Sequence, residues 1–203
     1  MNKKSFSLLE LIFAIVLLSI VIITIIPKNN TSKLQIATDK IILYLNYIRY
    51  IAFIDDKEHI DDNEWERKRW SLKFQKCSKK QDGIYFVVFS DISGGTSHFK
   101  KAETMKDPLN QKQLYVQSDC NPKEDESKNV LLTKEFGIKD IKVSCNNTST
   151  IGQIAFGKDG KVYSRLGENI KQIDKQCIIK LFDNNNNFTQ IAIEANTGYI
   201  HKL

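Results

Sequence analysis

The strongest constraint on this chain is a long apolar segment that begins close to Met1. Phe6 to Ile26 is a run of 21 residues with a single charged side chain, Glu10. As an α-helix this run would be about 31 Å long, which matches the roughly 30 Å of a bilayer's hydrocarbon core. The rest of the chain is rich in lysine, aspartate, asparagine and glutamine. The sequence therefore predicts one membrane-spanning helix followed by one polar globular domain.

The residues that flank the apolar run determine how it would sit in a membrane. A cleaved secretory signal peptide has a shorter apolar core and ends in small residues, whereas this run ends in Ile25-Ile26-Pro27-Lys28. Lys3 and Lys4 precede the run, and positive residues there favour a cytoplasmic N-terminus. Two hypotheses stay open at this point, an uncleaved signal-anchor and a helix whose short leader is removed. Both place the body across the membrane from the N-terminus.

Glu10 is the residue that distinguishes these two hypotheses. An ionised side chain inside a membrane helix costs about 2.5–3.5 kcal/mol, so it requires a partner or a function. The segment Lys3-Lys4-Ser5-Phe6-Ser7-Leu8-Leu9-Glu10 resembles the N-terminal motif of the type IV pilin and type II secretion pseudopilin superfamily. That motif has a short basic leader, a processing site before a Phe, an apolar run, and a Glu four positions after the Phe.

The resemblance implies specific roles for four residues. Prepilin peptidase would cut between Ser5 and Phe6 and methylate the new amine of Phe6, although the family usually has Gly where Ser5 stands. Glu10 would neutralise the Phe6 amine of a neighbouring subunit in a filament, because each charge would otherwise be buried alone in an apolar core. Pro27 stands where many pilins have a helix-bending proline. A proline removes one helical hydrogen bond whatever the family.

Helical periodicity continues after the apolar run. Apolar residues recur on one helix face at Leu34, Ile41, Leu45, Ile48 and Ala52. We therefore expect four segments: a leader at 1–5, a transmembrane and filament-core helix at 6–27, an amphipathic helix at 28–58 and a β-rich periplasmic domain at 59–203. The expected fold class is α+β and pilin-like. One long N-terminal helix, membrane-spanning in its first half and amphipathic in its second, would pack on a C-terminal antiparallel β-sheet.

From Arg69 onward the apolar pattern changes to the two-residue period of strands. Apolar, aromatic and β-branched runs predict strands at 70–74, 83–89, 113–117, 138–145, 152–156, 161–164, 177–182 and 188–194. Asp159-Gly160 predicts a hairpin turn. The body is most similar to H-type pseudopilins and FimT-like minor pilins, through Trp70 and through segments at 46–49, 154–157 and 197–200.

The resemblance implies a structural role. The expected protein is a pseudopilin subunit of a type II secretion system, held in the inner membrane by a single pass, with its N-terminus cytoplasmic and its C-terminal domain periplasmic. It would assemble into a pseudopilus. Its expected partners are other pseudopilins or pilins, prepilin peptidase, the assembly platform with its ATPase, and membrane lipid. The alternative is a minor pilin of a DNA-uptake machine that binds DNA through a basic body.

The net charge bears on the DNA alternative. The formal charge is +6, and DNA affinity comes largely from lysine and arginine contacts to phosphates. The candidate contacts are Lys73, Lys76, Lys79 and Lys80. Lysines along a sheet edge also protect strands from aggregation, and a diffuse excess of charge is typical of a solvated surface.

The four cysteines indicate disulfides in preference to a metal site. They lie far apart in the chain, at Cys77, Cys120, Cys145 and Cys177, without the close C-x-x-C spacing of zinc and redox motifs. In an exported body they would form one or two disulfides, with three full pairings available. A bridge between Cys145 and Cys177 is preferred because both lie in the C-terminal half of the chain. Free buried thiols remain open as an alternative.

The histidines and motifs of the chain do not favour catalysis. His59, His98 and His201 are scattered along the sequence, and no nucleophile elbow or metal-spaced His/Glu pair accompanies them. We therefore expect a protein that is not an enzyme and that carries no metal and no cofactor.

Overall fold

The fold is described from a computed structural model of the chain. It describes residues 8–25, 32–55, 57, 65–78, 82–93, 99–146, 149–166 and 171–203. The chain divides into two compact units, Met1–Thr31 and Ser32–Leu203. The first unit contains helix α1, Leu8–Ile25, and the second contains every other helix and strand.

Helix α1 is shorter than the apolar run predicts. It has 18 residues, which correspond to a length of about 27 Å, against the roughly 30 Å of a hydrocarbon core. Within the described parts of the chain, no helix combines the length and the apolar content that crossing a membrane requires. The prediction of a single-pass inner-membrane protein with a periplasmic domain is therefore wrong by this finding.

The expected fold class is also corrected. In place of one long N-terminal helix packed on a single sheet, the described residues form separate helices α1, α2 (Lys33–Ile54) and α3 (Leu132–Phe136), together with two antiparallel sheets. Pro27, where a helix bend was predicted, lies outside the described residues.

Helix α2 begins where a serine can cap it. The Ser32 side chain accepts a hydrogen bond from the backbone N–H of Gln35 at 3.2 Å, which satisfies one of the free donors of the first turn. The helix ends at Asp55, whose backbone N–H donates to the carbonyl of Ile51. One face of α2 is buried, and it comprises Leu34, Ala37, Thr38, Ile41, Tyr44, Leu45, Ile48 and Ala52. Helix α2 lies within the segment 28–58 for which an amphipathic helix was predicted.

The larger sheet has five strands in the order β2-β1-β4-β5-β6. The strands are β1 (Ser71–Lys76), β2 (Ile84–Phe89), β4 (Gly152–Phe156), β5 (Val162–Arg165) and β6 (Lys171–Gln172). All neighbouring strands in it run antiparallel. The hairpin between β4 and β5 turns at Asp159 and Gly160, and Gly160 has a φ of +79°, a left-handed conformation that glycine adopts without strain.

The smaller sheet has four antiparallel strands in the order β3-β7-β8-β9. The strands are β3 (Ile138–Val143), β7 (Cys177–Asp183), β8 (Phe188–Ile193) and β9 (Ile200–Lys202). Helix α3 leads into β3 through Gly137, which ends the helix in the left-handed conformation with a φ of +69°. Short 3₁₀ helices lie at Trp65–Lys68, Lys101–Glu103 and Lys128–Val130.

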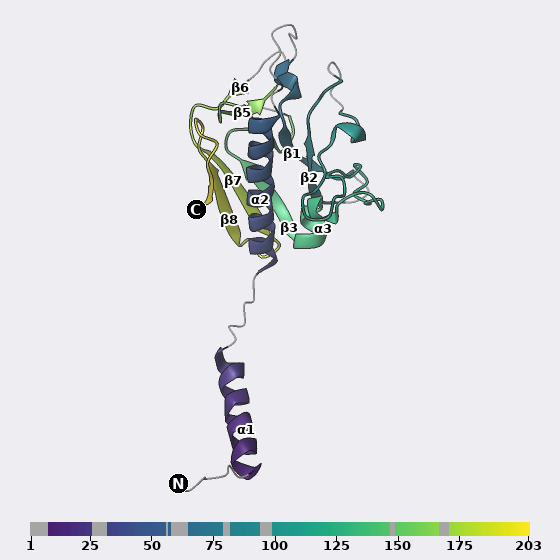
Figure 1. The fold of residues 1–203 in the computed structure, drawn as a ribbon. Helices are drawn as coiled ribbons and strands as arrows, with labels where there is room; N and C mark the ends of the chain where they lie inside the picture. The colour runs from purple at the N-terminus through teal and green to yellow at the C-terminus, as the bar shows by residue number, and fades with distance from the viewer. Residues whose placement is uncertain are drawn as a thin grey trace. The chain divides into compact units, whose positions relative to one another are not determined.

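The core of Ser32–Leu203 forms where α2 meets both sheets. In Figure 1 α2 stands between β7 and β8 on one side and β1 and β2 on the other, and it contacts strands of both sheets. The largest fully buried side chains include Tyr44, Phe74, Phe86 and Phe156. Every member of the hydrophobic core cluster lies within this unit. The unit therefore has a core of its own, formed by described residues from Leu34 to Ile200.

A buried carboxylate joins α2 to the irregular segment between β2 and α3. Asp107 accepts hydrogen bonds from the hydroxyl of Tyr44 at 3.0 Å and the hydroxyl of Ser127 at 2.6 Å. It also accepts from the side-chain amide of Asn129 and the backbone N–H of Leu109, each at 2.9 Å. Burial alone would raise the pKa of this carboxyl, but the four donors outweigh that effect and hold the pKa below its ordinary value.

Candidate functional site

The described side chains of α1, apart from Glu10 and Ser19, are apolar, and they lie on every side of the helix. They are all exposed within this structure, and the large apolar ones range from 51 % exposed at Val16 to 78 % at Leu8. A surface helix of a globular protein usually has one apolar stripe and one polar face, whereas a helix that is apolar all round is normally buried. We call this surface, formed by the described side chains from Leu8 to Leu18, the α1 surface. Its chemistry suits burial among other apolar groups.

Glu10 lies in the first turn of α1 and is exposed. A carboxylate near a helix N-terminus interacts favourably with the helix dipole, so this position also stabilises α1 locally. The residues with which the sequence analysis grouped it, Ser5, Phe6 and Pro27, lie outside the described residues.

The lysines proposed as DNA contacts are not brought together on β1. Lys73 is half-buried, and burial lowers its pKa while the Asp91 carboxylate opposes that effect. Lys76 is exposed at the end of the strand. Because the two residues are three positions apart and side chains alternate between the faces of a strand, they lie on opposite faces of the sheet. Lys79 and Lys80 lie outside the described residues.

Two disulfides link segments of Ser32–Leu203. Cys77, directly after β1, pairs with Cys120 in the irregular segment, with a Cα–Cα distance of 5.7 Å. Cys145, which follows β3, pairs with Cys177 at the start of β7, with a Cα–Cα distance of 5.2 Å. The second pair is the one that the sequence analysis preferred.

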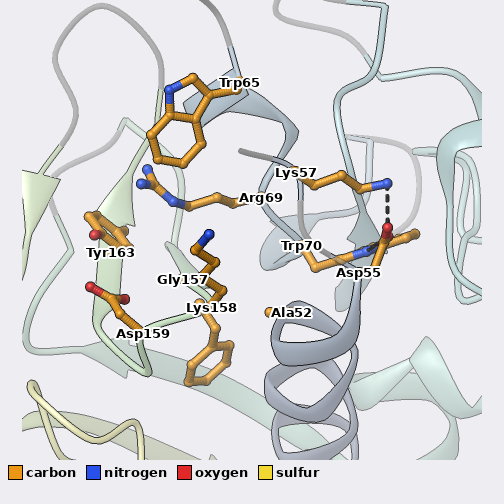
Figure 2. A pocket seen from close by; sticks show the side chains of 11 residues that line it. Ala52, Asp55, Lys57, Trp65, Arg69, Trp70, Gly157, Lys158, Asp159 and Tyr163 are labelled. Carbon is orange, nitrogen blue, oxygen red and sulfur yellow. Dashed lines mark hydrogen bonds and ion pairs between the residues drawn. The ribbon is translucent and has the colours of Figure 1, made fainter. Parts of the chain in front are cut away.

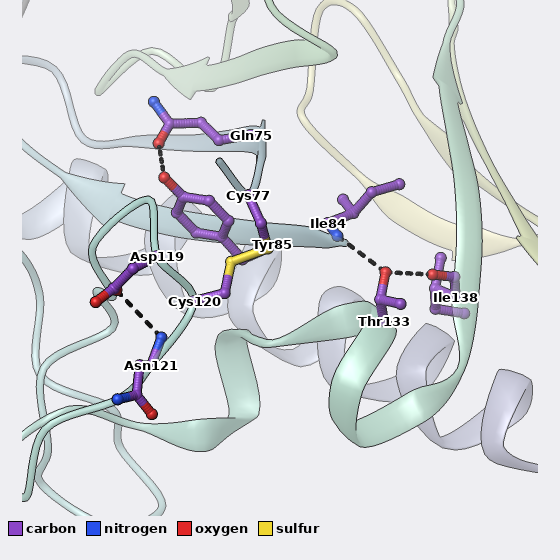
Figure 3. The surroundings of a disulfide bond; sticks show 9 residues. All are labelled: Gln75, Cys77, Ile84, Tyr85, Asp119, Cys120, Asn121, Thr133 and Ile138. Atoms are coloured by element: carbon purple, nitrogen blue, oxygen red, sulfur yellow. Dashed lines mark hydrogen bonds between the residues drawn. A yellow bond between two sulfur atoms is a disulfide. The ribbon is translucent and has the colours of Figure 1, made fainter. Parts of the chain in front are cut away.

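The groups around the first disulfide form hydrogen bonds within the fold (Figure 3). The hydroxyl of Thr133 accepts from the backbone N–H of Ile84 at 2.9 Å and donates to the carbonyl of Ile138 at 2.5 Å, so α3 is tied to both sheets. The Tyr85 hydroxyl donates to Gln75 at 2.7 Å, and burial raises the pKa of Tyr85 to about 12. This arrangement is typical of a structural bridge.

A small pocket lies beside the C-terminal end of α2. It has a volume of about 170 Å³ and is lined by Ala52, Asp55, Lys57, Trp65, Arg69, Trp70, Phe156, Gly157, Lys158, Asp159 and Tyr163. These residues come from three places in the chain: the end of α2, the segment before β1, and the β4–β5 hairpin. Figure 2 shows the pocket with its charged and aromatic side chains facing one another.

Arg69 is the central side chain of this pocket. It is only 8 % exposed, and its guanidinium carbon lies 4.4 Å from the ring centroid of Trp65 and 4.1 Å from that of Tyr163. Figure 2 shows the guanidinium group between these two rings. The geometry is that of a cation–π sandwich, which Arg forms more readily than Lys because its guanidinium is planar. Among the described residues, its buried Nε and Nη1 have no hydrogen-bond partner.

The two carboxylates that line the pocket are bonded to other groups. Asp55 accepts from the indole N–H of Trp70 at 2.7 Å and pairs with Lys57 at 2.8 Å. Asp159 pairs with the ammonium of Lys161 at 3.0 Å. Burial alone would raise the pKa of Asp159, but hydrogen bonds from Lys161 hold it below its ordinary value. Each carboxylate therefore has a cation of its own apart from Arg69.

This pocket was not predicted from the sequence. Trp70 was assigned to a strand and to the family resemblance, and Arg69 and Trp65 were given no functional role. One signal was present: the chain has only two tryptophans, and they flank the basic segment Glu66-Arg67-Lys68-Arg69. The third aromatic group, Tyr163, comes from a distant hairpin that no local pattern connects to this segment.

Comparisons of the chain with protein-family models, with curated proteins and with solved structures found no match.

Proposed function

We propose that the chain is a pilin-like subunit, of the pseudopilin kind, that assembles with other copies of itself or with related subunits through α1. The observation that carries this proposal is the α1 surface, which is apolar on all sides and exposed within the chain. The resemblance of Lys3 to Glu10 to the prepilin motif supports it. The proposed setting is a type II secretion pseudopilus, with prepilin peptidase and an assembly ATPase as partners.

The form of the α1 surface favours several partner helices over one. A single partner covers one stripe of a helix, and α1 has apolar side chains on all of its faces. Burying one Leu, Ile or Phe side chain contributes about 1.5–3 kcal/mol, so a bundle in which α1 is surrounded by copies of itself is strongly favoured. The second unit has its own core and both disulfides, and such bridges persist in oxidising compartments. The second unit can therefore remain folded while α1 packs against the α1 helices of other subunits.

Glu10 sets a requirement on such a bundle. Burying a carboxylate among apolar helices is favourable only beside a cationic group that forms good hydrogen bonds with it. The prepilin resemblance supplies that group, the amine of a neighbouring subunit's Phe6 after processing. The pairing of carboxylate and amine would fix the stagger between adjacent helices.

Replacing Glu10 with alanine is expected to lower incorporation into the assembly at least about tenfold, because removing one member of a buried ion pair leaves the other charge uncompensated. The measurement is the fraction of a tagged, processed variant that sediments together with an excess of the untagged processed chain. Glu124→Ala, which removes an exposed carboxylate from the second unit, is the matched control. Equal incorporation of Glu10→Ala and the control would contradict the assembly role of Glu10.

A further inference from the structure

We infer that the Arg69 pocket binds a carboxylate of the size of one acidic side chain, presented by a partner polypeptide. This inference is independent of the proposed function, because the pocket lies wholly within Ser32–Leu203. Three properties of the pocket support this inference: the N–H groups of Arg69 that lack an acceptor, the charges of the lining residues and the volume of the pocket.

The guanidinium of Arg69 has N–H groups that lack an acceptor among the described residues. Trp65 and Tyr163 cover its two faces, so its N–H bonds, which lie in the plane of the group, are the part that can bind a ligand. Buried N–H groups cost free energy when they lack an acceptor, and Nε and Nη1 lack one among the described residues. Carboxylates and phosphates are the acceptors whose geometry matches a planar guanidinium. The rings also hold the group in place, so little side-chain entropy is lost on binding.

The charges of the pocket favour an anion with one negative charge. Asp55 is compensated by Lys57 and Asp159 by Lys161. Arg69 is buried between two neutral rings, and the other cation of the lining, Lys158, is exposed. A phosphate or sulfate carries more negative charge and would be placed close to two carboxylates. A monovalent carboxylate matches the one buried positive charge, that of Arg69, and is repelled less by those carboxylates.

The volume favours a side chain over a cofactor. Pockets for drug-sized ligands measure about 300–1,000 Å³, whereas this one measures about 170 Å³. The aromatic lining suits the methylene groups of a glutamate while the guanidinium binds its carboxylate. The pocket therefore fits the end of one acidic residue.

The tryptophans provide a direct assay, because the only two in the chain both line the pocket. The probe is N-acetyl-glutamate N-methylamide, and the isosteric glutamine derivative is its neutral control. For the full chain in non-ionic detergent at constant ionic strength, we expect a saturable change in tryptophan fluorescence with the glutamate probe only. The response should disappear as the pH falls below about 4, where the carboxyl of the probe is protonated.

Variants assign the response to Arg69. Arg69→Gln is expected to weaken binding of the glutamate probe at least about tenfold, the loss typical of a charge-assisted hydrogen bond. Arg69→Lys keeps the positive charge but lacks the planar guanidinium. Its affinity for the glutamate probe should lie between those of the parent chain and Arg69→Gln. Lys76→Gln removes an exposed lysine outside the pocket and should bind as the parent chain does.

Three results would overturn the inference: no fluorescence response to the glutamate probe, an equal response to the glutamine probe, or tighter binding of inorganic phosphate than of the carboxylate. A fourth result would overturn the assignment to a partner's side chain: acetate binding as tightly as the glutamate probe would show that the pocket takes a free small anion. If Arg69→Gln does not fold, the comparison of the two probes on the parent chain still decides the question.

Discussion

Replacing Cys77 and Cys120 together with serine lowers the free energy of unfolding of the Ser32–Leu203 unit by about 2–4 kcal/mol. The bridge closes a loop between residues 43 positions apart, and its loss releases the unfolded chain from that constraint. It also frees the irregular segment around Cys120, which few strand hydrogen bonds hold in place. The measurement is urea unfolding followed by circular dichroism.

The second bridge provides the comparison. Cys145 and Cys177 are 32 positions apart, and the cost of removing them should be of similar size, because loop-closure entropy changes slowly with loop length. Removing both bridges should cost a large part of the 5–15 kcal/mol that stabilises a typical domain. An unchanged unfolding midpoint in the Cys77/Cys120 double variant would show that this bridge does not form or does not contribute.

The second large effect concerns the buried carboxylate of Asp107. Replacing it with alanine is expected to destabilise the unit by about 2–4 kcal/mol, because the donors of Tyr44, Ser127 and Asn129 lose their shared acceptor inside the protein. Asp159→Ala is the control, since its carboxylate is partly exposed and, among the described residues, accepts from the ammonium and the backbone N–H of Lys161 in its own turn. Equal unfolding midpoints for the two variants would contradict the role given to Asp107.

The pH dependence of stability gives an independent test of the same group. The folded pKa of Asp107 lies below its ordinary value, so its ionised form contributes stability above the unfolded pKa of about 3.9. That contribution is lost as the pH falls through the lower folded pKa. Below about pH 4 the parent chain should therefore lose stability more steeply than Asp107→Asn, which has no proton to gain.

Local patterns predicted most of the strands of the two sheets. The alternation around Leu72 and Phe74 and the apolar run that ends at Phe89 correspond to β1 and β2, and the Asp159-Gly160 turn joins β4 to β5 as expected. These elements are determined by side-chain period and turn chemistry, which a sequence displays directly. They were predictable because both signals act over a few residues.

The strand predicted at 113–117 does not form, because contacts with residues distant in the sequence determine the conformation of this segment. Gln113 makes only isolated bridges, to Lys106 and to Glu126. The surrounding segment is organised instead by buried carboxylates: Glu126, for example, accepts from the backbone N–H of Lys123 and from the ammonium of Lys101. Such bonds depend on residues that meet only in the folded chain, so the strand propensity of the segment was overridden.

Local sequence patterns also failed to predict where the N-terminal helices begin and end, and failed to predict the Arg69 pocket. The apolar run indicated a longer helix than the 18 residues of α1, and a helical period on both sides of Pro27 suggested one continuous element. The Ser32 cap instead starts α2 separately. In the pocket, Trp65 and Arg69 are close in sequence, but the sandwich exists only because the β4–β5 hairpin brings Tyr163 to the other face.

The central claim is that α1 drives assembly, and sedimentation velocity of two chains tests it most directly. One is the processed chain containing α1, and the other begins at Ser32 and retains the whole core and both disulfides. After dilution from detergent, the proposal predicts large assemblies of the first chain and a monomer of the second. Equal sedimentation of the two chains as monomers, or binding of the first to phospholipid vesicles as single copies, would contradict it.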